Sequence, residues 1–381
     1  MKTKTILSTY YNHESDDNRP YFDKEMTNIV KGLALIMMFI HHFFMFPEWW
    51  EEDISYPIIE KISLYLQRPT KLCVSIFCFL TGYFYYFTKE KTYQYSFKKI
   101  SDLLISYWVI YIPFAIIAAT ITEYKYTPIM FLQELFALKR PTMKFCWYVN
   151  FYCLFMLILP LVVKTLKYNI HINLLIVLIF IPTLFNLINK FIGNRSEILY
   201  ETIDSIRAWF PNVLIGYLFA KYVTFKQIES WYNNHIRGKT INVILPICAI
   251  IIIPLGRYIE PSMTIILHKL PLCKEEISFF IVFDIIYAPL FIYFVIVAAR
   301  IINIGYLKQG LSIIGKNSVL MWFAHCLFFS NSKTIFQPLL YLPQNPILVL
   351  FWGIALCLVI SYIGNKLITK INGKKNQLFF S

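Results

Sequence analysis

Residues 31–44 read KGLALIMMFIHHFF, with a lysine before the apolar run and two histidines near its end. In an α-helix, Lys31 and His42 lie about three turns apart, so they share one face at a separation of roughly 16 Å along the axis. His41 points about 100° away from His42. The run and its flanks, near 29–47, are long enough to cross a bilayer. The segment therefore predicts a membrane helix with a cation at one edge and an imidazole at depth.

The composition extends this interpretation to the whole chain. Of 381 residues, 57% are apolar, 18% are aromatic and only 15% are charged, whereas soluble domains contain roughly 25% charged residues. Water is therefore not the main solvent. The net charge of +14 would suggest nucleic acid in a soluble protein, but here the basic residues stand in short links between apolar segments. We interpret them as topology signals and partners of anionic membrane lipid, and we expect no nucleic-acid partner.

A window of about 20 residues predicts an all-α integral membrane fold of about ten transmembrane helices. They fall near 29–47, 71–88, 101–121, 146–163, 171–190, 208–222, 241–256, 278–300, 312–330 and 346–369. Most Lys and Arg residues lie in links on the same side of the membrane as the N-terminus. This bias places both termini in the cytoplasm. The predicted organisation is a cytoplasmic N-terminal segment, 1–28, a polytopic membrane domain, 29–370, and a cytoplasmic tail, 371–381. Residues 1–28 contain no apolar run, so we expect no signal peptide.

Ionisable residues inside apolar segments are costly and mark functional sites by default. Besides Lys31 and the two histidines, the chain places Asp284 in the eighth predicted span and His325 in the ninth. Lys31 either extends to lipid phosphate or binds an anionic substrate, and His42 is either a packing residue or a reactive group. The cysteines form no C-x-x-C pair, so we expect neither disulfides nor a metal site.

Six short motifs follow one another along the chain. They are Lys31 with His42, Val74–Phe84, Lys98 with Lys99, Cys146–Val149, Arg207–Gly216 and Gly315–His325. In this order they resemble acyltransferase family 3, bacterial membrane enzymes that O-acetylate sugars of cell-surface glycans, over about residues 20–330. Two residues depart from the family pattern. Lys31 stands where Arg is usual, which removes the bidentate fork but keeps the charge, and Thr81 stands where Ser is usual and keeps the hydroxyl.

The resemblance implies a multi-pass O-acyltransferase of the bacterial cytoplasmic membrane that moves an acetyl or other acyl group from acetyl-CoA to a polysaccharide hydroxyl. His42 would be the catalytic residue, either as the general base for the hydroxyl or as the carrier of the acyl group. Lys31, Lys98 and Lys99 would bind the donor phosphates at the inner interface. The alternative for Lys98 and Lys99 is the ordinary excess of cations on the cytoplasmic side. Acetyl-CoA is the donor co-substrate, and no metal is implied.

The acceptor implied is a glycan or a lipid-linked oligosaccharide. Glu48, Trp147 and Asn150 lie at predicted outer helix ends, where an indole can stack on a sugar while carboxylate and amide groups bond its hydroxyls. The aromatic belt of the bilayer is the alternative explanation for such rings.

Three further residues are expected to support the site. They are Thr81, Asp284 and His325, with Asp284 favoured for a structural hydrogen bond because a buried carboxylate needs a partner. Two rival functions stay open at this point. One is a carrier, flippase or polymerase that handles glycan lipids without acyl chemistry. The other is an inactive relative that serves as a sensor or scaffold.

Overall fold

The computed structural model describes residues 19–45, 56–121, 127–138, 143, 145–192, 196–236, 238–259, 283–302, 304–329 and 336–379. Within these ranges all regular structure is helical, which confirms the all-α part of the predicted fold class. Glu48, one of the residues predicted to bind the acceptor, lies outside the described ranges.

Seven helices in the described ranges are long and apolar enough to cross a membrane. They comprise α2 (Lys24–Phe43), α5 (Tyr93–Ile121), α7 (Trp147–Thr165), α8 (Ile170–Leu175) continued through Ile176–Phe180 into α9 (Ile181–Ile192), α12 (Lys239–Leu255), α14 (Asp284–Ile301) and α18 (Pro346–Phe379). An eighth span results if α15 (Gly305–Lys316) and α16 (Ser318–Cys326), which meet at an angle of 68°, are counted as one broken helix.

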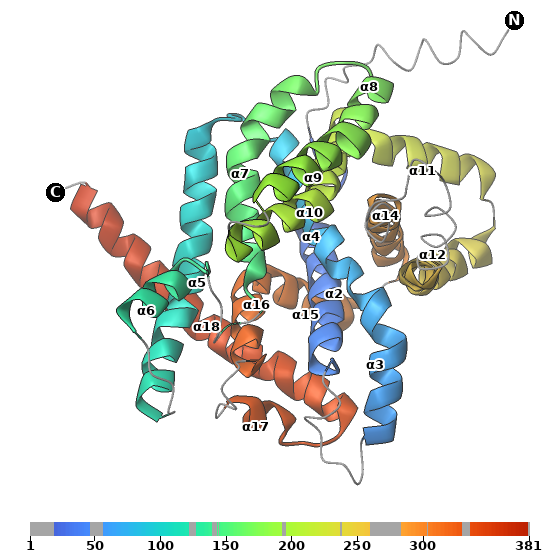
Figure 1. The fold of residues 1–381 in the computed structure, drawn as a ribbon. Coiled ribbons are helices and arrows are strands. Elements are labelled where there is room, and N and C mark those ends of the chain that lie inside the picture. Colours follow the sequence, from blue (N-terminus) through green and yellow to red (C-terminus); the bar gives the residue numbers. More distant parts are fainter. Residues whose placement is uncertain are drawn as a thin grey trace, which may run out of the picture.

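The predicted count of ten includes two segments that do not qualify alone. One is α4 (Leu72–Tyr86), which has only 15 residues. The other is α10 (Glu197–Lys221), which is long enough at 25 residues but carries five charged side chains. These two helices nevertheless pack along each other in the interior (Figure 1). Neighbouring helices therefore shield α4 and α10 from lipid, although hydropathy alone would not place these two helices across a bilayer.

Shorter helices complete the described chain. They are α3 (Tyr56–Thr70), α6 (Pro128–Leu135), α11 (Thr224–His235) and α17 (Phe336–Tyr341), with short turns of 3-10 helix at Gly256–Tyr258 and Leu327–Phe329. Helix α3 leads into α4 with one residue, Lys71, between them.

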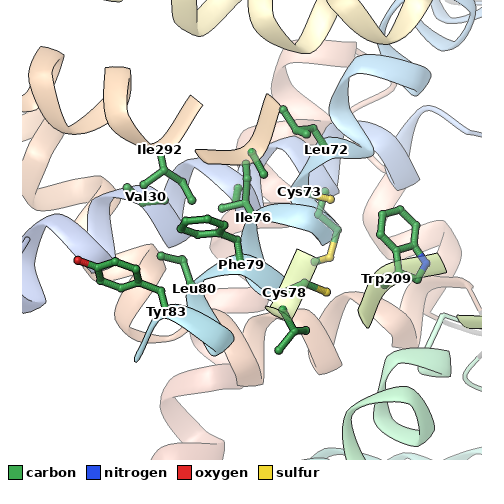
Figure 2. Packing of buried hydrophobic residues seen from close by; sticks show 14 of the residues in the cluster. Val30, Leu72, Cys73, Ile76, Cys78, Phe79, Leu80, Tyr83, Trp209 and Ile292 are labelled. Carbon is green, nitrogen blue, oxygen red and sulfur yellow. The ribbon is translucent and has the colours of Figure 1, made fainter. Parts of the chain in front are cut away.

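Helix α4 lies at the centre of the packed interior. Its Phe79 is fully buried, as are Val30 of α2 and Ile292 of α14 on the neighbouring helices. Figure 2 shows these side chains together with Cys73 and Cys78 of α4 and Trp209 of α10. Lipid tails are as apolar as these residues, so the helices associate through close packing rather than through release from water.

Two pairs of glycines allow this close packing. A Cβ on Gly82 of α4 would lie 1.6 Å from the carbonyl oxygen of Val213 in α10, and one on Gly216 would lie 2.1 Å from that of Phe79. Gly32 and Gly315 bring α2 and α15 together in the same way, with Gly315 against the carbonyl of Asn28 at 1.8 Å. Backbones approach this closely only where the side chain is a hydrogen.

The bend between α15 and α16 is held by Asn317. Its backbone N–H bonds the carbonyls of Ile313 and Ile314 and ends α15. Its side-chain oxygen accepts a hydrogen bond from Asn365 of α18 at 2.8 Å. Its side-chain amide also donates to the carbonyl of Ile313 at 2.8 Å. A side chain that inserts into the backbone hydrogen-bond ladder is a common cause of a helix bend. The bend redirects α16 so that His325 reaches His42 of α2.

Candidate active site

A cavity of about 960 Å³ opens between α2, α4, α5, α7, α10 and α16. Binding sites for small molecules and cofactors span about 300 to 1,000 Å³, so this cavity has room for a large ligand. Both Lys31 and His42 line it, as expected from their shared helix face. The structure therefore places the two ends of the first motif in one continuous space.

Three histidines meet at one end of this cavity. His42 Nδ1 lies 2.9 Å from His325 Nε2, and the two rings meet edge to edge with centroids 4.9 Å apart and planes inclined by only 10°. Phe145 covers one face of the His42 ring, with centroids 4.2 Å apart. His41 turns away and bonds the carbonyl of Gln67 through Nδ1 at 2.7 Å. His42 is thus held at its edge by His325 and on one face by Phe145, and it also borders the cavity.

Two of the described lysines line the opposite end of the cavity. Lys31 and Lys99 both line the cavity, close enough for their charges to interact. The ammonium group of Lys99 also lies 5.6 Å from the ring centre of Tyr95. Two half-buried cations side by side repel each other unless an anion joins them, so this end of the cavity is suited to a phosphate group. Lys98 is exposed on another face of α5 and does not line the cavity.

Helix α10 runs from one end of the cavity towards the other. Its Trp209 contacts Trp147 at the start of α7, with ring centroids 6.3 Å apart. Its Tyr217 contacts Tyr85, which in turn contacts Tyr95 near the two lysines. The N-terminal turns of α10 therefore extend past Trp209, away from the lysine end. They contribute carboxylate and hydroxyl groups to the cavity wall, from Tyr200, Glu201, Asp204 and Ser205.

Asp284 lies outside the cavity in a sealed polar cluster. The side chain is fully buried, pairs with Arg257 at 3.1 Å and accepts a hydrogen bond from the hydroxyl of Ser75 at 2.6 Å. None of these three residues lines the cavity. The cluster joins α4, α14 and the turn after α12, which fits the structural hydrogen bond expected for Asp284.

The remaining predicted residues divide between the cavity wall and the scaffold. Trp147 and Thr81 line the cavity, and the Thr81 hydroxyl also bonds the carbonyl of Phe77 within its own helix. Asn150 does not line it. Its amide donates to the carbonyl of Ala137 at 2.6 Å, where the backbone has a left-handed φ of 53°. Asn150 thus holds the turn after α6, and its side chain has no place in the cavity wall.

Sequence reasoning missed several groups of the wall. Lys71 borders the cavity within electrostatic range of His41 and His42. On α5 the wall is formed by Tyr95, Lys99, Asp102 and Ser106, which repeat every three or four residues. That spacing marks one face of a helix, so the polar stripe on α5 was a readable signal that also separates Lys99 from Lys98. No such signal exists for Lys71.

Among the described residues, no group of His, Cys, Asp and Glu side chains is arranged to hold a metal ion. The site is therefore built from a histidine pair, a lysine pair and a wall of aromatic and carboxylate side chains. These features define a polytopic membrane protein with a deep cavity that is lined by imidazoles at one end.

Residues 27–366 match the acyltransferase domain family Acyl_transf_3. The match covers nearly the whole chain, so the chain belongs to this family and is an acyltransferase. Searches of curated proteins and of solved structures found no match to the chain.

Proposed function

We propose that the protein is a membrane O-acyltransferase that moves an acetyl or other acyl group from acetyl-CoA to a hydroxyl of a cell-surface or lipid-linked polysaccharide. One observation carries the proposal. A single cavity is bordered by two lysines at one end and by His42 at the other, where His325 and Phe145 hold the imidazole ring. Such an arrangement suits a long donor with an anionic head and a reactive tail.

The lysine end accounts for the donor. Coenzyme A carries its phosphates at the nucleotide and its thioester at the tip of a slender pantetheine arm. Lys31 and Lys99 would hold phosphate oxygens by charge-assisted hydrogen bonds. Lys31 and His42 are separated by about 16 Å along α2, a distance that an extended pantetheine arm can span. The thioester carbon would then lie beside His42.

The histidine end accounts for the transfer. A hydroxyl is a weak nucleophile until a base removes its proton. His42 Nε2 would take this proton while the hydroxyl oxygen attacks the thioester carbon. The carbon–sulfur bond then breaks, and the departing thiolate recovers the proton from His42. In the alternative route, Nε2 attacks the thioester carbon and the carbon–sulfur bond breaks, releasing the thiolate. The hydroxyl oxygen then takes the acetyl group from Nε2 as the carbon–nitrogen bond breaks, and the hydroxyl proton passes to the thiolate. Both routes use the same nitrogen atom.

The acceptor would enter from the side of Trp147 and Trp209. Indole rings stack on the apolar faces of sugars, and the carboxylates of Glu201 and Asp204 can accept hydrogen bonds from sugar hydroxyls. The bias of Lys and Arg residues supports cytoplasmic termini, so we place the donor end towards the cytoplasm and the acceptor end towards the outer face of a bacterial cytoplasmic membrane.

The test is transfer of radiolabelled acetyl from acetyl-CoA to glycan in membranes carrying the wild type or His42→Ala at equal amounts. Label incorporated by the wild type and lost in the variant supports both the activity and the role of His42. Equal incorporation overturns the role of His42. If neither membrane transfers label when the native acceptor is present, the acetyl-CoA-to-glycan reaction is wrong.

A further inference from the structure

The contact between His42 and His325 restricts where each ring carries its hydrogen. His325 Nδ1 faces the carbonyl oxygen of Trp322, one turn earlier in α16. A carbonyl oxygen only accepts hydrogen bonds, so Nδ1 of His325 must carry the hydrogen. In a neutral imidazole only one nitrogen is protonated, and His325 Nε2 is therefore left with a lone pair.

This lone pair sets the hydrogen of the second ring. His325 Nε2 lies 2.9 Å from His42 Nδ1, and one of the two nitrogens must donate. Because His325 Nε2 is the acceptor, His42 Nδ1 carries the hydrogen. The lone pair of neutral His42 then stands on Nε2. The two imidazoles meet edge to edge in nearly the same plane, which suits an N–H···N hydrogen bond, and Phe145 packs on one face of the His42 ring.

We infer that His325 is a positioning residue that fixes the tautomer and orientation of His42, so that Nε2 is the reacting nitrogen. This inference rests on the proposed function. The hydrogen bonds then run in one direction. His325 donates to the carbonyl of Trp322 and accepts from His42, and His42 donates to His325 and accepts from the substrate. The carbonyl of Trp322 thereby governs, through two rings, which nitrogen of His42 meets the acceptor hydroxyl.

The arrangement also suits the charge that develops on His42. When Nε2 takes a proton or an acetyl group, the ring becomes cationic and Nδ1–H becomes a stronger donor. The lone pair of His325 Nε2 strengthens this hydrogen bond as the charge develops. His325 is fully buried, so no water molecule competes for the bond. In metal sites, a partner that orients a ligating imidazole contributes about 10- to 100-fold to metal affinity or activity, and we expect an effect of this size for His325.

The experiment compares His325→Met with His325→Gln in purified protein, and measures kcat, the KM for acetyl-CoA and the melting temperature. Methionine fills the space but offers no comparable acceptor, so kcat should fall about 10- to 100-fold with KM unchanged. Glutamine can place its amide oxygen where Nε2 was and accept from His42 Nδ1–H, so it should restore most of the lost kcat. Leu320→Met, a volume-conserving change at a buried residue of α16 that packs towards α5, is the matched control and should keep the wild-type kcat.

A second readout does not depend on turnover. In protein with ¹⁵N-labelled histidine, the resonances absent from His42→Ala identify the His42 ring. A protonated Nδ1 and an unprotonated Nε2 support the inference, whereas the opposite tautomer overturns it. Wild-type kcat in His325→Met, or equal loss in the Met and Gln variants at equal melting temperature, also overturns it. Failure of the wild type to transfer acetyl would refute the proposed function. The ¹⁵N spectrum would then still show which nitrogen of His42 is protonated, so it tests the tautomer separately.

Discussion

Two clusters of buried polar side chains lie beside α4, and they differ in what surrounds them. The histidine cluster, His42 with His325, borders the cavity through His42, whose Nδ1 is bonded to His325 while no hydrogen bond from the described residues engages its Nε2. The carboxylate cluster, Asp284 with Arg257 and Ser75, lies outside the cavity wall and is held by an ion pair and a hydrogen bond. Burial of an ionisable residue in a membrane helix therefore does not by itself indicate a reactive group. Access to a cavity distinguishes a candidate reactive group from a structural one.

The largest expected effect is on chemistry at the histidine cluster. His42→Ala should lower kcat by about 10² to 10⁴, the usual contribution of a general base. Its melting temperature should change little because the ring borders a cavity. Steady-state transfer and thermal unfolding of the same preparation measure both quantities. A variant that loses activity only in proportion to its folded fraction would remove the distinction between the clusters.

The carboxylate cluster should show the reverse pattern. Asp284→Ala breaks the buried ion pair with Arg257 and removes the acceptor of the Ser75 hydroxyl, and breaking a buried pair costs about 3 to 5 kcal/mol of stability. Transfer per folded molecule should stay close to that of the wild type. Thermal unfolding in detergent, with activity normalised to folded protein, tests this.

The paired substitution sharpens the same prediction. Asp284→Leu combined with Arg257→Met removes both charges and should recover most of the lost stability. If instead Asp284→Ala stays stable and loses kcat, Asp284 acts on the reaction and the cluster is not structural.

A smaller effect is expected at the lysine end of the cavity. Lys31→Met and Lys99→Met should each raise the KM for acetyl-CoA about 10- to 100-fold, since a hydrogen bond to a charged group contributes about 1.5 to 3 kcal/mol. Lys98→Met is the matched comparison on the next residue of α5 and should keep KM within about twofold because its side chain points elsewhere. Equal shifts in Lys98→Met and Lys99→Met would indicate a general surface charge effect.

The smallest effect belongs to Asn150. Asn150→Ala removes the hydrogen bond to the carbonyl of Ala137 and should cost about 1 to 3 kcal/mol of stability. Because the side chain lies outside the cavity, affinity for the acceptor should not change. A raised KM for the acceptor at unchanged melting temperature would restore the acceptor-binding role that the sequence suggested for this residue.

The sequence predicted the helical membrane fold and the shared face of Lys31 and His42, because both follow from hydropathy and helical periodicity. It did not separate Lys98 from Lys99, because adjacent residues of a helix differ only in which neighbours they face. It did not separate Asn150 from Trp147, because the bond of Asn150 to the carbonyl of Ala137 is a contact with another part of the chain. The approach of His325 to His42 depends on the bend at Asn317, which follows from tertiary contacts with α18. Hydropathy likewise could not show that α4 and α10 are shielded by other helices.

The central claim is that one cavity joins a donor end to an acceptor end across the bilayer. Sealed vesicles of known orientation test it, with labelled acetyl-CoA confined to the cytoplasmic face and glycan acceptor confined to the opposite face. The account predicts acetylated glycan in wild-type vesicles and none in His42→Ala vesicles. Transfer that begins only after the vesicles are permeabilised would place both substrates on one side and contradict the account.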